Sequence, residues 1–258
     1  MTKFFIGLDN VSHAWPFKQT VISVNRIRGR KSGFRINDWI MDSGAFTEIS
    51  NHGRWRTPPE DYAREIVKHS TNGTMLAAVS QDYMCEDFIL EKTGLSIPQH
   101  QSLTIERYRA LVSLTGIPIM PVLQGYSPGD YVIHLEQYGD LLLPGHWVGV
   151  GSVCKRNSDP DQIEFVLRCI KSQRPDLRLH GFGLKTTALK NPSIRELLHS
   201  SDSMAWSYHC RMNGLDNHDP RNALAYAANI QKITGEKQFV QEPLFEWWQD
   251  DFSQDPTE

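Results

Sequence analysis

Short apolar runs recur along the chain, and most of them end in a small or polar residue. Runs of this kind, bounded by turn residues, are typical of buried β-strands. The pattern therefore predicts eight strands, at residues 4–9, 20–24, 38–44, 76–82, 117–125, 146–152, 177–183 and 202–208.

Longer stretches between the later runs space their apolar residues as amphipathic helices do. Residues 58–69 open with Pro and acids, as helix starts do, and residues 98–116 close on a Gly, which is common just beyond a helix end. The pattern predicts helices at residues 58–69, 98–116, 127–142, 159–173, 192–200 and 220–235.

Strands that alternate with helices predict βαβ units and a parallel sheet. Eight such strands in 258 residues indicate a single-domain, TIM-like (β/α)8 barrel over residues 1–240, followed by an acidic C-terminal tail at 241–258. A doubly wound open sheet is the alternative fold, although no G-x-G-x-x-G follows the first strand.

The composition, with 40% hydrophobic and 22% charged residues, is that of an ordinary globular protein. No apolar run approaches the roughly 18 residues that span a bilayer. The N-terminus MTKFFIGLDN has no signal-peptide apolar region, so a cytoplasmic protein is expected. The four cysteines are isolated and form no C-x-x-C pair, so neither a disulfide framework nor a structural zinc site is expected.

The formal net charge of −3 is unevenly distributed. Residues 241–258 hold six acids and no Lys or Arg, so the rest of the chain is net positive. Five basic residues fall within residues 25–35, and Arg54 and Arg56 follow soon after. Such a cluster is either a solvated loop or a phosphate-binding patch, and the sequence leaves both interpretations open.

Polar and small residues stand where the predicted strands end, and in a parallel barrel these ends build the active site. Glycines let a flat ligand approach the backbone, and Gln and Asp can bind the hydrogen-bonding edge of a heterocycle. Two further carboxylates can act as acid/base and nucleophile at a glycosidic carbon. Each Asp alone is explained as well by a turn or helix cap, so the hypothesis rests on the set. Its members are Asp42, Ser43, Gln81, Asp82, Gln124, Gly125, Gly151, Ser152, His180, Gly181, Gly183, Asp202 and Ser203.

Five segments carry a family resemblance: MDSGAF (41–46), VLQGY (122–126), VGVGSVCKR (148–156), LHGFGLK (179–185) and SSDSMAWSYHCR (200–211). In this order they resemble motifs of the tRNA-guanine transglycosylases, which exchange guanine for a 7-deazaguanine in a polynucleotide. The resemblance is strongest to the DNA-modifying, DpdA-type relatives in phages and bacteria. The matched blocks extend over most of the chain.

The resemblance implies residue roles, with Asp202 as the nucleophile and Asp42 as the acid/base residue that also contacts the base. Bacterial tRNA enzymes place the nucleophilic acid where this chain has Ala205. The archaeal-type pattern D-S-x-A-aromatic instead fits Asp202, the only acid in its segment. The implied base-binding residues are Asp82, Gln124, Gly125, Gly151, Ser152, Ser43, Gly181 and Phe182, with Met204 as a second candidate to pack on the ring.

The resemblance also implies the reaction and the polymer. Guanine in DNA would be exchanged for a 7-deazaguanine free base, such as 7-cyano-7-deazaguanine (preQ0), through a covalent Asp202–DNA intermediate and without a metal or redox cofactor. The C-x-C-x-x-C zinc subdomain and extra RNA-binding domain of the tRNA enzymes are missing from this sequence, which favours DNA. The modification would protect phage DNA from restriction, in a phage-infected or bacterial host cell. The predicted phosphate contacts are Arg26, Arg28, Arg30, Lys31, Arg54, Arg56, Lys155, Arg156 and Lys185.

Three other functions stay open at this level. The same chemistry can act on tRNA, the barrel can bind nucleic acid without catalysis, or water can replace the second base and make the protein a hydrolase. The acids at positions 42, 82 and 202 argue against a pure binding protein, because binding alone needs no carboxylate aimed at a sugar carbon.

Overall fold

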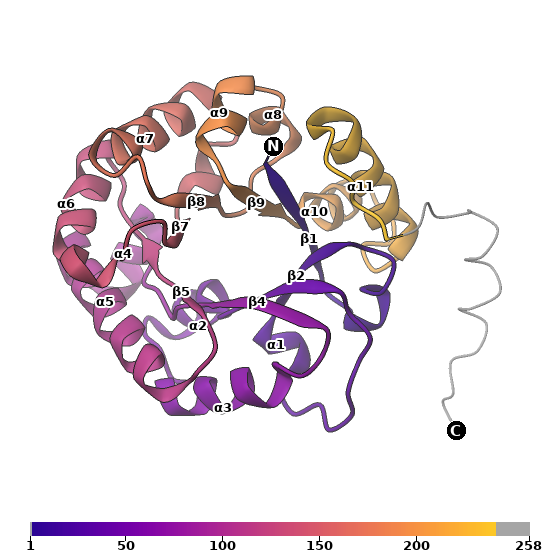
Figure 1. The fold of residues 1–258 in the computed structure, drawn as a ribbon, viewed down its shortest axis with the longest axis horizontal. Helices are drawn as coiled ribbons and strands as arrows, with labels where there is room; N and C mark the ends of the chain where they lie inside the picture. The colour runs from indigo at the N-terminus through magenta and orange to yellow at the C-terminus, as the bar shows by residue number, and fades with distance from the viewer. Residues whose placement is uncertain (1, 241–258) are drawn as a thin grey trace.

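The computed structural model describes residues 2–240, so the predicted acidic tail at 241–258 lies outside the described residues. Parallel strands form one sheet in the order β5-β4-β3-β2-β1-β9-β8-β7-β6, which curls into a barrel surrounded by helices (Figure 1). The strands are β1 (Lys3–Leu8), β2 (Gln19–Ser23), β3 (Asp38–Asp42), β4 (Thr74–Val79), β5 (Ile119–Met120), β6 (Val122–Leu123), β7 (Trp147–Val150), β8 (Arg178–Gly181) and β9 (Ser200–Ser203).

Strands β5 and β6 are two halves of one strand, separated only by Pro121, whose nitrogen has no hydrogen to donate to a ladder. β5 pairs with β4, and β6 pairs with β7. The Pro121 carbonyl still accepts a hydrogen bond from the Gly149 N–H at 2.8 Å. The two ends of the sheet order are therefore joined through the chain itself, which gives eight strand positions. The prediction of a TIM-like (β/α)8 barrel is confirmed, and the open sheet is excluded.

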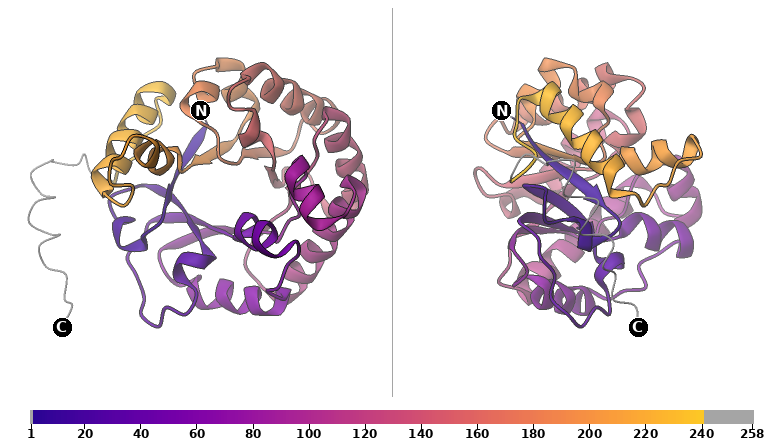
Figure 2. Two further views of the ribbon diagram at one scale, coloured as in Figure 1. Left: turned by 180° about the vertical axis from the view of Figure 1, so that it is seen from behind. Right: turned by 90° about the vertical axis from the view of Figure 1, so that its right-hand side faces the viewer.

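Helices cover the outside of the barrel, as the two views of Figure 2 show. The six predicted helices are confirmed, and each has a Pro in its first turn, where the missing N–H costs no hydrogen bond. They are α3 (Pro59–His69), α5 (Ile97–Leu114), α6 (Pro128–Tyr138), α7 (Pro160–Gln173), α9 (Pro192–Leu197) and α11 (Pro220–Thr234).

Shorter helices that the sequence did not predict follow several strand ends. The helix α2 begins directly after Gly44, whose φ of 77° permits the sharp turn out of β3. The unpredicted elements are α1 (Val24–Ile27), α2 (Ala45–His52), α4 (Asp87–Thr93), α8 (Thr186–Leu189), α10 (Ala205–Met212) and the 3-10 helices η1 (Val11–His13), η2 (Gly139–Leu141) and η3 (Val153–Arg156).

The predicted strand at residues 202–208 is wrong, because β9 ends at Ser203 and residues 205–212 form α10. The strand itself is polar, and its position is set by pairing with β1 and β8. The apolar residues that suggested a strand belong to the helix. Among them, Trp206 is buried and its indole N–H donates to the Gly7 carbonyl at 2.8 Å, which ties α10 to the end of β1.

The interior of the barrel is apolar in its middle and polar at the carboxyl ends of the strands. Phe5, Val21 and Ile40 belong to a buried cluster distinct from the one formed by the outward residues and helices. Because side chains alternate along a strand, Asp42 lies on the same inner face as Ile40. Asp202 pairs in register with Phe5. Strand geometry therefore brings two carboxyl groups to the interior near the barrel mouth.

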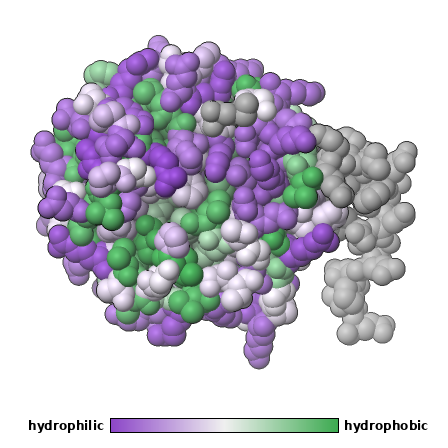
Figure 3. All heavy atoms as spheres, in the orientation of Figure 1, coloured by the Kyte–Doolittle hydropathy of each residue, from purple (hydrophilic) through white to green (hydrophobic). Residues whose placement is uncertain are grey.

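The amino ends of the strands form a different surface. A hollow of about 800 Å³ there is lined by residues that start the strands, including Leu76, Ile119, Trp147 and Arg178. Apolar side chains gather on this face in Figure 3. In residues 2–240, no helix is both long and apolar enough to cross a membrane.

Candidate active site

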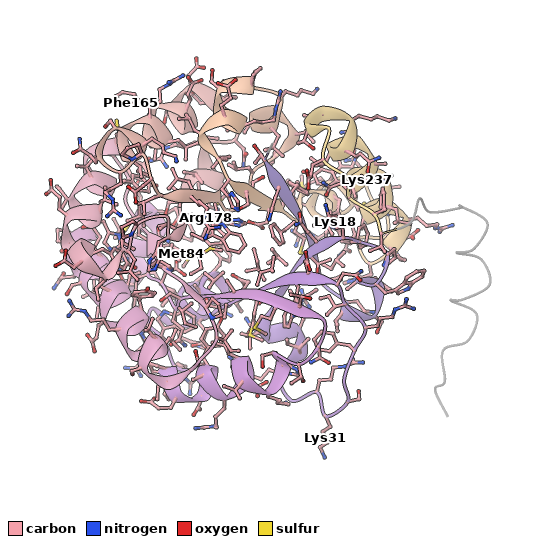
Figure 4. The ribbon with its side chains drawn as sticks, viewed as in Figure 1. Lys18, Lys31, Met84, Phe165, Arg178 and Lys237 are labelled. Carbon is pink, nitrogen blue, oxygen red and sulfur yellow. The ribbon has the colours of Figure 1, made fainter. Side chains whose placement is uncertain are left out.

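A cavity of about 590 Å³ opens at the carboxyl ends of the strands. Asp42, Asp82 and Asp202 all line it, together with Gln124. The labelled Met84 in Figure 4, which also lines the cavity, projects toward the middle of the barrel. The three acids come from β3, the loop after β4, and β9, so the fold brings together residues that are far apart in the sequence.

Asp42 ends β3, where its Oδ2 accepts a hydrogen bond from the Gly44 N–H at 3.0 Å. Glycine is favoured here because the φ of 77° is one that side chains rarely adopt, and a Cβ would also lie 2.4 Å from Asn25 Nδ2. Burial raises the pKa of Asp42 above its ordinary value, although the hydrogen bonds from Gly44 and the Ser23 hydroxyl act against this. The neighbouring Asp202 charge raises the pKa further. Asp42 is thus a carboxyl group biased toward its protonated form.

Among residues 2–240, the hydrogen bonds to Asp202 are made to one of its oxygens. Its Oδ1 accepts hydrogen bonds from His180 Nε2 and from the Gly183 N–H, both at 3.1 Å. Its side chain is 15% exposed, so it reaches the cavity while most of it is covered. Two N–H donors therefore fix the position of this oxygen. The other oxygen, Oδ2, is the one available to a ligand in the cavity.

The His180 ring is fixed by a chain of polar groups below the cavity. The Trp147 indole N–H donates to Ser200 Oγ at 2.7 Å, and Ser200 Oγ lies 2.9 Å from His180 Nδ1. An ionised Asp202 can only accept a hydrogen bond, so it requires the proton on His180 Nε2, and the Ser200 hydroxyl can then donate to Nδ1. In this tautomer Nε2 donates to Asp202, and the Trp147–Ser200 pair holds the opposite side of the ring.

Asp82 and Gln124 form a hydrogen-bonded pair on another wall of the cavity. Gln124 Nε2 donates to Asp82 Oδ2, and the Ser152 hydroxyl donates to Gln124 Oε1 at 2.9 Å. These two bonds fix which end of the amide carries the nitrogen. Burial raises the pKa of Asp82 to about 7, against the lowering effect of the Gln124 hydrogen bond. The pair therefore presents a carboxyl group that changes charge near neutral pH.

The backbone beside this pair is shaped for close approach. A Cβ on Gly151 would lie 2.1 Å from Gln124 Nε2, so only glycine leaves the amide in place. Ser152 has a φ of 59°, the one positive value among the non-glycine residues from 2 to 240. This conformation places its hydroxyl between Gln124 and the Cys85 N–H, which donates to it at 3.3 Å. Such an unusual backbone is typical of functional sites.

Apolar side chains complete the cavity. Phe182 lines it and packs against His180, with ring centroids 4.8 Å apart. Gly149 is needed beneath it, since a Cβ there would lie 2.3 Å from the Phe182 ring. Met204 also lines the cavity and covers Gly7. Both residues predicted to pack on a base are thus present in the cavity wall.

Three predicted base-binding residues do not line the cavity. The Ser43 side chain is buried, Gly125 packs against Asp130 and Tyr131, and Gly181 packs against Leu184. Their place is in the packing that supports the cavity wall. Trp55, which follows Arg54, is also part of the packing, because it is buried and its indole N–H donates to the Asp82 carbonyl at 3.0 Å.

The predicted phosphate contacts separate into a mouth group and an outer group. In the mouth group, Arg26 and Lys155 line the cavity, Arg156 donates to the Ser152 carbonyl at 3.0 Å, and Lys185 lies on the loop after β8 beside Tyr208.

The outer group lies away from the cavity. Arg28 and Arg56 border a separate groove that also contains Glu48, and Arg30 stacks on Phe34. Figure 4 shows Lys31 pointing outward at the edge of the molecule. Arg54 is exposed and also lies outside the cavity lining.

The structure adds Ser200, Ser23 and Asn25 to the site, and it gives His180, already a member of the strand-end set, a contact with Asp202. His180 was placed at a strand end without a role, although register pairs it with Ser200 across β8 and β9. Ser23 ends β2 and Asn25 lies in α1 directly after it, and this strand end was not included among the candidate positions. Within the described part of the chain, no group of three His, Cys, Asp or Glu residues is arranged to hold a metal ion.

The fold and this site define a (β/α)8-barrel protein with an acidic cavity at the carboxyl ends of its strands. A family model described as "DpdA: DeoxyPurine in DNA protein A" matches residues 17–240. The match covers most of the chain, which therefore belongs to this family, as its motifs predict. Membership assigns the protein to DNA modification and supports a transglycosylase, which is a kind of glycosyltransferase, acting on guanine in DNA. A comparison with curated proteins gives no match.

Proposed function

We propose that the protein exchanges guanine in DNA for a 7-deazaguanine free base, such as preQ0, by double displacement. The observation that carries this proposal is the shared cavity: a carboxylate held by two N–H donors, Asp202, faces the same space as Asp42 and the Asp82–Gln124 pair. Family membership supplies DNA as the polymer.

In the first step, Asp202 Oδ2 attacks C1′ of the target nucleotide. The C1′–N9 bond breaks, its electron pair stays with guanine, and the protonated Asp42 carboxyl supplies a proton to the leaving base. The transition state has oxocarbenium character, as in retaining glycosidases. The raised pKa of Asp42 suits this role, because it favours the protonated carboxyl group that the leaving base requires.

In the second step, N9 of the incoming 7-deazaguanine attacks C1′ from the side that guanine has left. Its N9 proton passes to the Asp42 carboxylate, the C1′–O bond to Asp202 breaks, and the electron pair returns to the carboxylate. Both acids end in the state in which they began. Neither step needs a metal or redox cofactor.

Asp82 and Gln124 account for the choice of guanine. Guanine offers N–H donors on the edge where adenine has an unprotonated ring nitrogen, and an ionised Asp82 can accept from such donors. Adenine offers no N–H donor at this ring position, so the Asp82 oxygen that faces the base would lose its hydrogen bond, which is costly in a buried site. The target base must leave its stack to reach this pair, and a cavity of about 590 Å³ is in the size range of ligand pockets.

The test is incorporation of labelled preQ0 into guanine-containing DNA and, in parallel, into tRNA. Label in DNA alone is expected, with one guanine released for each label incorporated. Label only in tRNA would support the exchange reaction but contradict DNA as its substrate. Guanine release without incorporation would show a hydrolase instead. If exchange into DNA is found, protection of phage DNA from restriction follows as the role we propose for it.

A further inference from the structure

Exposed aromatic rings stand at the mouth of the barrel, each beside a cation. Phe46 on α2 is 51% exposed and Phe88 on α4 is 44% exposed, and their ring centroids lie 6.2 Å apart. Lys155 Nζ lies 5.3 Å from each centroid. Two rings and one ammonium group thus form a single exposed platform.

The platform continues along the rim. Tyr126, in the loop after β6, is 49% exposed and has the Arg156 guanidinium 5.1 Å from its ring centroid. At another point of the barrel mouth, Tyr208 on α10 is 50% exposed, and Lys185 Nζ lies 5.2 Å from its ring centroid. The same pairing of ring and cation therefore occurs at separate points of the mouth.

All these residues lie on segments that follow strand ends, so they surround the entrance to the candidate active site. Phe46 and Lys155 even line the cavity itself. In the left view of Figure 2, which looks at the barrel from behind, the short helices α2, α4 and α10 stand in front of the ring at this end.

We propose that this aromatic rim binds unpaired nucleotides on either side of the target base, so that the substrate is a single-stranded or locally opened stretch of DNA. The inference rests on the proposed function and adds the strandedness of the substrate. Bases stack on exposed aromatic rings with little dependence on sequence, and the adjacent cations pair with phosphates. A closed duplex offers no free base face to such rings.

The charges favour this occupant over an apolar protein partner. A surface that binds an apolar partner gathers apolar groups and is depleted of charge at its centre. Here each exposed ring carries Lys or Arg within 6 Å, and the pairs lie on six different strand-end segments. Alternating rings and cations match the alternating bases and phosphates of one strand.

The test compares the binding of a guanine-containing single strand and of the matching duplex by the intact protein, measured by fluorescence anisotropy. The variant Phe46→Ala/Phe88→Ala is expected to bind the single strand roughly 10–100-fold more weakly, with duplex binding changed less than threefold. Tyr126→Ala alone should weaken single-strand binding by about tenfold. Leu143→Ala is the matched control, since Leu143 is 58% exposed before β7, away from the mouth.

Thermal unfolding checks that each variant is folded, and Tyr126→Ala still decides the matter if the double variant is not. Unchanged single-strand binding in folded variants, or equal losses for strand and duplex, overturns the rim proposal. If wild type still exchanges bases in that case, the proposed function stands. If the aromatic substitutions weaken single-strand binding but wild type exchanges no base, the rim proposal stands and the proposed exchange reaction is contradicted.

Discussion

His180 Nε2 lies 3.1 Å from Asp202 Oδ1, and the same ring is held from below by Ser200 Oγ at its Nδ1. The imidazole is fully buried, so it has one orientation. Its N–H therefore directs one oxygen of Asp202 inward and leaves the other for the cavity. His180 positions the proposed nucleophile without touching the reacting carbon itself.

Replacing His180 should thus lower the rate of the chemical step. For His180→Ala we expect kcat to fall roughly 10–100-fold, the range that follows from a small misplacement of a reacting group, while KM changes little. His180→Gln, whose amide can still donate to Asp202, should recover part of the loss. His69 is a matched buried histidine outside the cavity, paired with Glu65. His69→Ala should reduce the melting temperature but not kcat, and equal kcat losses for both variants would contradict the positioning role.

The pH dependence of exchange should follow Asp82. If the ionised carboxylate accepts the guanine N–H donors, activity rises with pH through about 7, the pKa to which burial raises this group. In Asp82→Asn the residual activity should no longer show this rise, because the amide does not titrate. A rise that persists in the variant would assign the titration to another group.

Asp82 should also have a measurable effect on stability. Between its ordinary pKa of about 4 and about 7, the folded state keeps a proton that the unfolded state has released. Stability is therefore lost as pH rises through this window. Asp82→Asn retains an oxygen that can accept from Gln124 and removes this cost. We expect its melting temperature to exceed that of wild type by about 2–4 °C at pH 8, with no gain at pH 4.

Gly151→Ala should displace Gln124, because the added Cβ would lie 2.1 Å from its Nε2. Loss of this geometry is expected to reduce exchange about 100-fold. Gly116→Ala is the control, since a Cβ at Gly116 meets no atom within 4 Å. Comparable activity in the two variants would show that Gln124 does not need its observed position.

Salt dependence separates the two groups of basic residues. Lys155 and Lys185 lie at the mouth, so Lys155→Gln/Lys185→Gln should lower the slope of log K against log salt by about 1.4, at about 0.7 per phosphate contact for a single strand. Lys31 points away from the barrel (Figure 4), and Lys31→Gln should leave the slope unchanged. A reduced slope in Lys31→Gln would extend the phosphate contacts to the loop at residues 25–35.

The barrel was predictable because parallel strands covered by helices are buried on both faces and appear as short apolar runs. Strand β9 could not be predicted in this way, because its sequence SSDS is polar. Only its pairing with β1 and β8 identifies it as a strand. The short helices α2 and α4 were missed for a related reason. They begin close to strand ends and are too short to show a clear helical period.

Much of the site followed from the position of acids at strand ends, which placed Asp42, Asp82 and Asp202 in one cavity. The role of His180 could not be predicted from the sequence, since it depends on the register between β8 and β9. The basic cluster was also ambiguous. Proximity along a loop does not fix the direction in which each side chain points: Arg30 stacks on Phe34, and Lys31 points outward.

The most direct test of the account is to trap the covalent intermediate. Wild type, Asp202→Asn and Asp42→Asn are incubated with labelled guanine-containing DNA in the absence of a free 7-deazaguanine, denatured, and mapped by mass spectrometry. The account predicts a DNA adduct on Asp202 in wild type and none in Asp202→Asn. An adduct on Asp42 or Asp82, or full base exchange by Asp202→Asn, would contradict it.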